Sequence, residues 1–515
     1  LKRMTVDEKI DQMFTVGCNQ LGEIIKKMES GELGSISATY QVAGFSAKDY
    51  NRLQSLQLKK SRLGIPLILH GENLHGVRHP LCTVFPTNGC LAATFNEKLA
   101  GEVASATAKE GRALGITQLY APNVDISRDL RWGRTEENFG EDPYLTSVMG
   151  ERIVKNFQKN KVAATVKHYL AYGLGEGGLN LAPAHIGERE VREYMLPPFS
   201  ACIKKGKAWA IMPSYNEIDG VPVHASPLWM KKVLREELKF DGVVVTDYGA
   251  ADMLVYCHHI ADKPVEVGKI LCDNEIDMEA CGYYGYNDEF RRLVKDGKYP
   301  IAKVNKCVSN ILRLKFRLGL FEHPFVDERG ESKLHSARTV ALSRKVAEQG
   351  IVLLKNKGIL PLKGNEKIAL IGPNADVAQL GNYVAYDYKE TCYDGEYVAE
   401  KAPTLKTVFE ESGKPFEYAQ GCDFHKTDEE SLNVAAKIVR NADVVVLAVG
   451  DNSKDGACGG KQEDLVKLGK SDKAVTSGEG YDLTSLELTK AQRSLFEKVA
   501  ECGKPIILVL YGGRP

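Results

Sequence analysis

The chain has 515 residues, more than one hydrophobic core usually organises, and its charges balance, with 68 Lys and Arg against 68 Asp and Glu. This balance excludes a general electrostatic attraction to nucleic acid or to an anionic membrane surface. No apolar run approaches the roughly 18 residues that span a bilayer. The composition therefore predicts more than one domain, no membrane or nucleic-acid partner, and a small neutral ligand.

Cysteines, histidines and glycines form no metal or nucleotide motif. The twelve cysteines contain no CxxC pair, which excludes a zinc framework or a dense disulfide scaffold, although one or two disulfides would fit an exported protein. His258 and His259 are adjacent, which is not a ligand spacing. We predict no metal and no cofactor. No signal peptide precedes the first helical segment, so the location stays open, with export preferred over the cytoplasm.

Five apolar runs along the chain end in polar or titratable side chains. In chain order they are PLILHGENLHG with His70, Glu72 and His75, LYAPNVDISRDLRWGR with Arg131 and Arg134, VAATVKHY with Lys167 and His168, AWAIMPSY with Tyr215, and GVVVTDYG with Asp247. Between them lie segments such as DPYLTSVMGERIVKNFQKN, whose apolar residues recur at the three- and four-residue steps of a helix. The alternation predicts a (β/α) barrel, in which strand ends converge on one face and bring these side chains into one pocket.

Asp247 is the leading catalytic candidate among them. It follows an apolar strand, and a carboxylate at the carboxyl end of such a strand lies where parallel α/β proteins carry out chemistry. The same aspartate could instead cap the helix that follows. Taken alone, this segment fits both interpretations, and the repetition of polar strand ends favours the catalytic one.

The pattern predicts two domains. Residues 1–322 form the barrel, closed by the helical IAKVNKCVSNILRLKFRLGLF, and the charged residues 323–350 form a linker. Residues 351–515 contain the β-branched runs KIALIG, DVVVLAVG and PIILVLYGG and the helical ESLNVAAKIVRNA, which predict an α/β sandwich with a parallel sheet. Both ends of the chain look cut, which predicts that it is a portion of a longer protein.

Several long segments, in order, resemble glycoside hydrolase family 3, the family of exo-acting β-glucosidases and β-xylosidases. They are MTVDEKIDQM, PNVDISRDLRWGRTEENFGEDPYL, KHYLAYG, MPSYNEIDGVPVHAS, LREELKFDGVVVTDYGA, LRLKFRLGLFEHPFVD and IVLLKNKGILPLK. The resemblance implies a (β/α)8 TIM-like barrel followed by an α/β sandwich, with the active site where the two meet. It also implies a further C-terminal domain, before which this chain would be truncated.

The resemblance implies a role for each of the polar strand ends. Asp247 matches the family's nucleophile, and the substrate-binding residues implied are Glu72, Arg134, Lys167, His168, Tyr215 and Tyr248. The family usually has Ser-Asp-Trp at the nucleophile, so Thr246 and Tyr248 are departures. We expect the lysine and arginine to lower the pKa of Asp247 and keep it ionised.

Retaining hydrolysis needs a second carboxyl, about 5 to 5.5 Å from the first, as acid and then base. Glu479 in TSGEGYDLTSLELTKAQ matches the family's acid/base loop, although an exposed loop glutamate would look the same. The family commonly has arginine where Leu483 stands here. Glu487 and Glu463 are the substitutes if Glu479 fails.

Glu72 bears on the choice of sugar. The family carries an acid at this position that grips hydroxyls remote from the scissile bond. Aspartate is frequent there in β-glucosidases and glutamate in β-xylosidases, but one methylene discriminates only about 10- to 200-fold. The loop YLAYGLGEGGLN lacks the Asp-Ser-His unit of the N-acetylglucosaminidase members, which favours sugars without an acetamido group.

The sequence therefore predicts a retaining, exo-acting β-glycosidase that removes terminal β-D-glucosyl residues from oligosaccharides or from aryl and alkyl glycosides. A β-xylosidase, also with glucosidase or arabinosidase activity, is the first alternative, and a catalytically inactive sugar-binding paralogue is the second. A homodimer is compatible with either.

Overall fold

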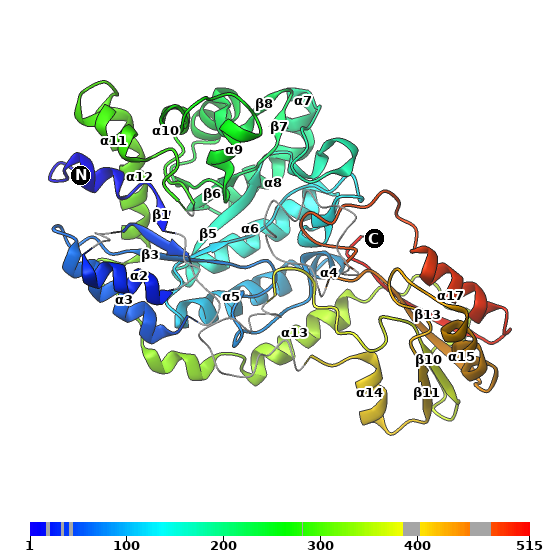
Figure 1. The fold of residues 1–515 in the computed structure, drawn as a ribbon. Helices are drawn as coiled ribbons and strands as arrows, with labels where there is room; N and C mark the ends of the chain where they lie inside the picture. The colour runs from blue at the N-terminus through cyan, green and yellow to red at the C-terminus, as the bar shows by residue number, and fades with distance from the viewer. Residues whose placement is uncertain are drawn as a thin grey trace.

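The computed structural model describes residues 1–16, 21–31, 36–40, 45–280, 282–384, 402–453 and 475–514. Two parts follow one another along the chain (Figure 1). The larger, from blue to green, surrounds a parallel sheet, and the smaller, from yellow to red, is built on a second parallel sheet. The prediction of two sheet-containing units, one after the other, is confirmed.

The N-terminal sheet has seven parallel strands whose order in space follows their order in the chain. They are β1 (Thr15–Val16), β2 (Ala38–Tyr40), β3 (Ile68–Glu72), β4 (Gln118–Tyr120), β5 (Ala163–Tyr169), β6 (Ala210–Pro213) and β9 (Val243–Val244). Isolated parallel bridges join Val245 to Met278 and Phe14 to Glu279. Because Met278 and Glu279 are consecutive, they connect the last strand of the sheet to the segment before the first. The sheet is therefore curled back on itself.

Helices connect these strands and cover the outside of the sheet (Figure 1). They are α1 (Val6–Ile10), α2 (Leu21–Ser30), α3 (Ala47–Lys60), α4 (Asn88–Ala93), α5 (Glu97–Ala113), α6 (Pro143–Lys159), α7 (Glu188–Glu190), α8 (Leu196–Lys204), α9 (Ala250–Tyr256), α10 (Pro264–Asp273), α11 (Asp288–Lys295) and α12 (Ile301–Leu318). This part also contains two π-helical segments, Val191–Met195 and Leu228–Glu237, short 3₁₀ turns, and an antiparallel hairpin of β7 (Glu217–Ile218) and β8 (Val221–Pro222).

Side-chain caps start several of these helices where the sequence changes from loop to apolar periodicity. Ser46 and Asp49 form a reciprocal capping box at the start of α3. Asp142 accepts a hydrogen bond from the backbone of Leu145 at the start of α6, where Pro143 occupies the first turn. These local signals explain why the helical segments begin where they do.

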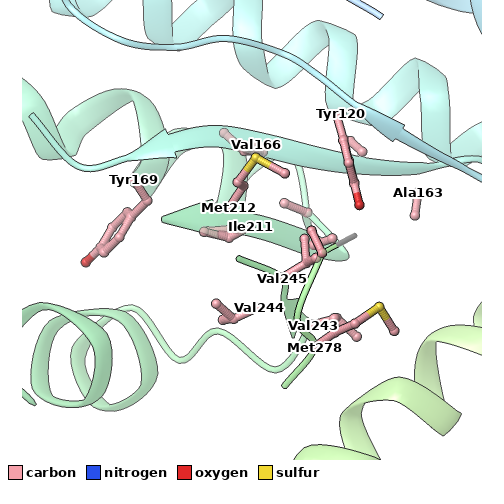
Figure 2. Close-up of a cluster of buried hydrophobic side chains, with 14 of the residues drawn as sticks. Tyr120, Ala163, Val166, Tyr169, Ile211, Met212, Val243, Val244, Val245 and Met278 are labelled. Carbon is pink, nitrogen blue, oxygen red and sulfur yellow. The ribbon is translucent and has the colours of Figure 1, made fainter. Parts of the chain in front are cut away.

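Most side chains of the curled sheet are apolar and buried (Figure 2). Val166, Ile211 and Val244 are fully buried, as is every residue of β5. Burying such an aliphatic side chain contributes about 1.5–3 kcal/mol, which explains why strands covered on both faces consist of near-continuous apolar runs. Polar side chains also lie among them: Gln118 donates a 2.9 Å hydrogen bond to Thr165, and β5 finishes with Lys167, His168 and Tyr169.

The C-terminal sheet has four parallel strands in the order β11 (Phe416–Ala419), β10 (Ile368–Ile371), β12 (Val444–Gly450) and β13 (Ile506–Tyr511). The helices α14 (Leu405–Ser412), α15 (Glu429–Arg440) and α17 (Lys490–Ala500) accompany it. The central strand β12 is buried along its whole length, whereas the edge strand β13 is half exposed. The three strands and the helix predicted here from the sequence are confirmed.

The stretch predicted as a linker contains regular structure. A 3₁₀ segment covers Glu328–Lys333, and α13 (Ala337–Gly350) packs against α4 and α5. Buried Glu110 accepts hydrogen bonds from the backbone of His335, at 2.9 Å, and from the side chain of Thr83. The connection is therefore held against the N-terminal part, although its composition alone resembles an open linker.

Within the described ranges, several predicted absences can be compared with the structure. None of the described helices is long and apolar enough to cross a membrane. No cluster of three His, Cys, Asp or Glu side chains in the described part of the chain could hold a metal ion. The cysteines that the structure describes, other than Cys257, are free thiols. Nothing in the described residues supports the predicted truncation of the chain.

Candidate active site

The predicted strand-end residues meet at the carboxyl edge of the curled sheet. Lys167 Nζ donates a 3.0 Å hydrogen bond to Glu72 Oε2, which joins the ends of β5 and β3. His168 Nε2 lies 3.5 Å from Asp247 Oδ2, which joins β5 to the segment after β9. All four side chains are almost completely buried. Residues as far apart in sequence as Glu72 and Asp247 thus line one polar pocket.

Asp247 does not cap the helix that follows it. The N-terminal cap of α9 is Gly249, which has a φ of 69° and makes no side-chain capping bond. Asp247 Oδ1 instead accepts a 2.8 Å hydrogen bond from the backbone N–H of Tyr248. Its Oδ2 atom has no hydrogen-bond partner within the described ranges and faces His168. The N-cap interpretation is therefore wrong, and one carboxylate oxygen is available to a ligand.

Burial decides the ionisation of Asp247. Loss of solvent raises the pKa of its carboxyl to about 6, and the charges of Lys167 and Arg134 only partly oppose this rise. Glu479 adds a smaller upward contribution. The sequence-based expectation of a lowered pKa is therefore wrong in its net direction, because desolvation outweighs the two cations. The group is still mostly ionised at neutral pH.

His168 is held by a buried carboxyl that the sequence analysis missed. Asp125 Oδ2 lies 2.8 Å from His168 Nδ1, and the backbone N–H of His168 donates to the same carboxyl at 3.3 Å. Burial raises the pKa of Asp125 to about 8 and lowers the pKa of His168, so the pair is favoured in its uncharged form. The contact fixes the ring so that Nε2 faces Asp247.

Arg134 connects the two parts of the molecule. Its Nε and Nη2 atoms donate to the two carboxylate oxygens of Glu137 at 2.9 and 2.8 Å, and Nη1 donates to Glu479 Oε1 at 3.0 Å. Asn123 Nδ2 adds a 2.7 Å hydrogen bond to Glu137. The planar guanidinium thus donates both to a carboxylate of its own loop and to one from the C-terminal part.

Glu479 reaches the pocket from the C-terminal part and is 8% exposed. Besides Arg134, its carboxylate accepts a hydrogen bond from the hydroxyl of Tyr383, also in the C-terminal part. Glu487, considered as a substitute, is exposed and pairs with Arg493 at 2.6 Å. Glu463 lies outside the described residues. Of the two described candidates for the acid/base residue, Glu479 lies in the pocket and Glu487 does not.

Aromatic side chains line the pocket. Tyr215 packs in a cluster with Trp132, Tyr172 and Met253, and its hydroxyl donates to the backbone oxygen of Tyr248 at 2.9 Å. The Tyr248 ring lies 5.8 Å from that of Tyr120. Tyr248 is therefore next to the catalytic candidate, where the sequence pattern expects an aromatic ring. Flat rings with polar edges suit the faces and hydroxyls of a sugar.

Comparison with known sequences decides the family. Residues 5–314 match the sequence model of the glycosyl hydrolase family 3 N-terminal domain, and residues 351–515 match that of its C-terminal domain. The chain belongs to glycosyl hydrolase family 3. The family resemblance deduced from the sequence motifs is confirmed.

Among curated family 3 relatives, a periplasmic β-glucosidase of Salmonella typhimurium is 32% identical, over 100% of this chain and 67% of its own length. A β-xylosidase of Formosa agariphila is 34% identical, over 88% of this chain and 63% of its own length. The chain thus spans about two thirds of the length of these relatives.

Solved structures of family 3 enzymes have the same fold. A β-glucosidase from Erythrobacter marinus superposes with a TM-score of 0.87 at 30% identity, covering 100% of this chain and 71% of that one. A β-glucosidase from Listeria innocua in complex with glucose gives a TM-score of 0.86 at 28% identity, covering 100% of this chain and 69% of that one.

Several pocket residues of this family 3 chain escaped the sequence analysis. They are Asp125, Glu136, Glu137, Tyr383 and Asp482. The first three lie in the segment PNVDISRDLRWGRTEENFGED, where the density of acids after a predicted strand was a usable signal. Tyr383 and Asp482 had no such signal, because nothing local marks a loop that will dock on another domain.

Proposed function

We propose that this chain is a retaining, exo-acting β-glucosidase in which Asp247 is the nucleophile and Glu479 the acid/base residue. The observation that carries the proposal is the position of two carboxyls from different parts of the chain in one buried pocket, with Arg134 bonded to Glu479 and its charge partly opposing the rise that burial causes in the pKa of Asp247. Paired carboxyls are the chemical requirement of glycoside hydrolysis.

In the first step Asp247 Oδ2 attacks the anomeric carbon while Glu479 gives its proton to the leaving oxygen. The bond from the anomeric carbon to the leaving group breaks as the bond to Asp247 forms. Glu479, now ionised, then takes a proton from water, which attacks the same carbon and releases Asp247. No metal or organic cofactor enters these steps.

The remaining predicted residues hold the sugar. Lys167, Arg134 and the Asp125-supported His168 offer hydrogen bonds to hydroxyls, and Glu72 accepts them. The Glu72 and Lys167 side chains are each 2% exposed, which supports a closed pocket end and therefore cleavage of terminal residues. Tyr215 and Tyr248 provide aromatic surface beside the nucleophile.

A β-xylosidase is the second candidate, supported by Glu72 and by the relative of that name from Formosa agariphila. The inactive sugar-binding alternative is disfavoured, because both carboxyls that turnover requires stand in the pocket.

We further propose that the curled sheet is a (β/α)8 barrel of residues 1–322 joined by 323–350 to an α/β domain of 351–515. Export is proposed by analogy with the periplasmic relative.

The test is the initial rate on 4-nitrophenyl β-D-glucoside and β-D-xyloside, measured side by side for the wild type and Asp247→Asn. We expect the glucoside to be the better substrate and the variant to lose at least about 10⁴-fold in kcat, because an amide cannot act as the nucleophile. A variant with near-wild-type turnover would contradict the assignment of Asp247. A clear preference for the xyloside would replace glucosidase by xylosidase.

A further inference from the structure

Asp482 stands three residues after Glu479, and its carboxylate accepts hydrogen bonds from the other part of the molecule. Its Oδ1 atom accepts a 2.7 Å hydrogen bond from the backbone N–H of Gly133, and its Oδ2 atom accepts one of 2.7 Å from the backbone N–H of Asn180. Gly133 lies in the loop after β4, and Asn180 in the loop after β5. One carboxylate thus joins the Glu479 loop to two loops at the mouth of the curled sheet.

Glu136 is a carboxylate of the N-terminal part that bonds to the C-terminal part. It lies in the loop after β4, is 4% exposed, and accepts hydrogen bonds from the backbone of Asn382 at 2.6 Å and from Ser477 Oγ at 2.8 Å. Ser477 is two residues before Glu479. Asn382 precedes Tyr383, whose hydroxyl bonds to Glu479. Glu136 therefore holds both C-terminal segments that reach the acid/base carboxyl.

The backbone of the loop that carries Glu479 also bonds directly to the backbone of the loop after β4. Gly478 donates its N–H to the oxygen of Gly133 at 2.9 Å, and Leu483 donates to the oxygen of Arg131 at 2.8 Å. A Cβ atom on Gly133 would lie 2.1 Å from the oxygen of Gly478. The Glu479 loop is thus laid against the loop that carries Arg134, with no space for a side chain between them.

We propose that Asp482 and Glu136 are positioning residues, a reciprocal pair of carboxylates that holds Glu479 in place for proton transfer. This inference rests on the proposed function, since it assigns them to the acid/base role of Glu479. Each carboxylate satisfies two donors that come from separate positions on the facing part. At Asp482 an amide of the same shape offers one oxygen and would turn its NH₂ group toward a backbone N–H donor. At Glu136 an amide keeps its bond from Asn382 but exchanges the charge-assisted bond from Ser477 for a weaker neutral one. The position of Glu479 therefore depends on charge in both side chains.

Changing a residue that only stabilises docking would lower the rates on all substrates alike. Changing a residue that positions the acid would lower the rate by an amount that depends on the leaving group. A good leaving group needs little protonation, so misplacing the acid hardly slows its departure. A poor leaving group depends on the proton. The second step, in which water must lose a proton, slows whichever leaving group the substrate carried. The glycosyl-enzyme then accumulates when the first step is fast.

The experiment compares kcat and KM for 2,4-dinitrophenyl and methyl β-D-glucoside, or the matching xylosides, in Asp482→Asn, Glu136→Gln and Glu479→Ala of the full chain. We expect Asp482→Asn and Glu136→Gln to lower kcat/KM about 10- to 100-fold for the methyl glycoside and less than about threefold for the dinitrophenyl glycoside. With the dinitrophenyl glycoside, kcat and KM should fall together.

Azide gives a second measurement that a structural role would not change. As a nucleophile without a proton to lose, it attacks the anomeric carbon of the glycosyl-enzyme, forms a C–N bond, and releases the Asp247 carboxylate. It should raise kcat for the two positioning variants and yield the β-glycosyl azide. The matched control is Glu487→Gln, an exposed acid eight residues beyond Glu479, which should leave both rates and the azide response unchanged.

The outcomes separate the inference from the function on which it rests. Equal losses on both substrates without an azide response, in variants whose melting temperature stays above the assay temperature, would overturn the positioning role of Asp482 and Glu136. Failure of Glu479→Ala itself to show the leaving-group dependence and azide response would overturn the acid/base assignment, and the inference with it. The predicted pattern in all three variants supports both.

Discussion

The two catalytic candidates are equally buried but are held in different ways. Asp247, 5% exposed, follows a strand of the curled sheet, and its neighbour Thr246 bonds through its N–H to Met278 and through its hydroxyl to the backbone of Ala280. Glu479, 8% exposed, stands in a C-terminal loop that bonds to loops of the N-terminal part. The first carboxyl is positioned by the domain that carries it, and the second by the domain that it faces.

This difference teaches that the two half-reactions depend on the structure unequally. Sugar binding and nucleophilic attack use groups of one sheet, so they should tolerate small shifts between the two parts. Proton transfer uses Glu479, whose position depends on how the C-terminal part docks on the N-terminal part. Changes at the contact between the parts should therefore reduce the rate with poor leaving groups before they reduce binding.

Among the residues around the two carboxyls, the largest effect is expected at Arg134, which contacts Glu479 and lies beside Asp247. In Arg134→Lys the ammonium cannot reproduce the planar fork to Glu137 together with the bond to Glu479. We expect kcat/KM on the aryl glycoside to fall about 100- to 1,000-fold, the range for a lost preorganised donor.

Arg131→Lys is the matched control for this change. Arg131 is a partly exposed neighbour that pairs with Asp129. Its lysine variant should retain the wild-type rate within about twofold, because surface ion pairs contribute little. Equal losses in both variants would contradict a special role for Arg134.

The next effect concerns stability rather than rate. Because burial raises the pKa of Asp247 from its ordinary 3.8 to about 6, the ionised carboxyl costs about 3 kcal/mol of folding free energy above pH 6. The folded state binds the proton more tightly than the unfolded state, so this cost disappears as the pH falls from 6 toward 4. Asp247→Asn should therefore be more stable than the wild type at pH 8, and the gain should shrink at pH 4.5.

Urea denaturation at the two pH values measures this difference. The control is Asp428→Asn, which changes an exposed N-terminal cap of α15 to another good capping residue and should give no comparable gain. A variant that is less stable than the wild type at pH 8 would show that ion pairing, rather than burial, dominates at Asp247.

A smaller effect is expected from adding one methyl group at the contact between the two parts. Gly133→Ala places a Cβ atom against the backbone oxygen of Gly478, so the Glu479 loop must move. We expect about 10- to 100-fold loss in kcat/KM on a methyl glycoside and less on a dinitrophenyl glycoside. Gly187→Ala, where no atom lies within 4 Å of the added Cβ, should leave both rates unchanged.

The smallest effect is the pH dependence of the wild type. The nucleophile must be ionised, and its pKa of about 6 predicts that kcat/KM rises with pH until about 6 and then levels on that side. Between pH 7 and pH 5 the rate should fall about tenfold. A profile that stays flat down to pH 4.5 would mean that burial does not raise the pKa of Asp247 in the free enzyme.

Much of the fold could be predicted from the sequence because its signals are local. β-Branched runs such as DVVVLAVG mark buried strands, and the apolar steps of residues 143–159 mark a helix that the structure confirms as α6. Polar residues after each strand indicate the carboxyl edge of a parallel sheet, which is why Glu72, Lys167, His168 and Asp247 were expected together and are found together.

Other features could not be predicted because they depend on distant contacts. The charged residues 337–350 look like a linker until α4 and α5 are placed beside them. Tyr383 stands beside Glu479 only because two loops nearly a hundred residues apart dock on the same strand ends. The net direction of the pKa of Asp247 required knowing how completely its surroundings exclude water, which no count of nearby cations supplies.

The sequence by itself determined the order of strands and helices, the family, and the residue types at the strand ends, because hydrogen bonding within helices and the side-chain periodicity of strands depend on near neighbours. The tertiary structure alone decided which glutamate enters the pocket, what holds it there, and how strongly burial opposes the charge of Asp247. These depend on solvent exclusion and on the docking of two separate sheets, which the chain encodes only through the complete set of its long-range contacts.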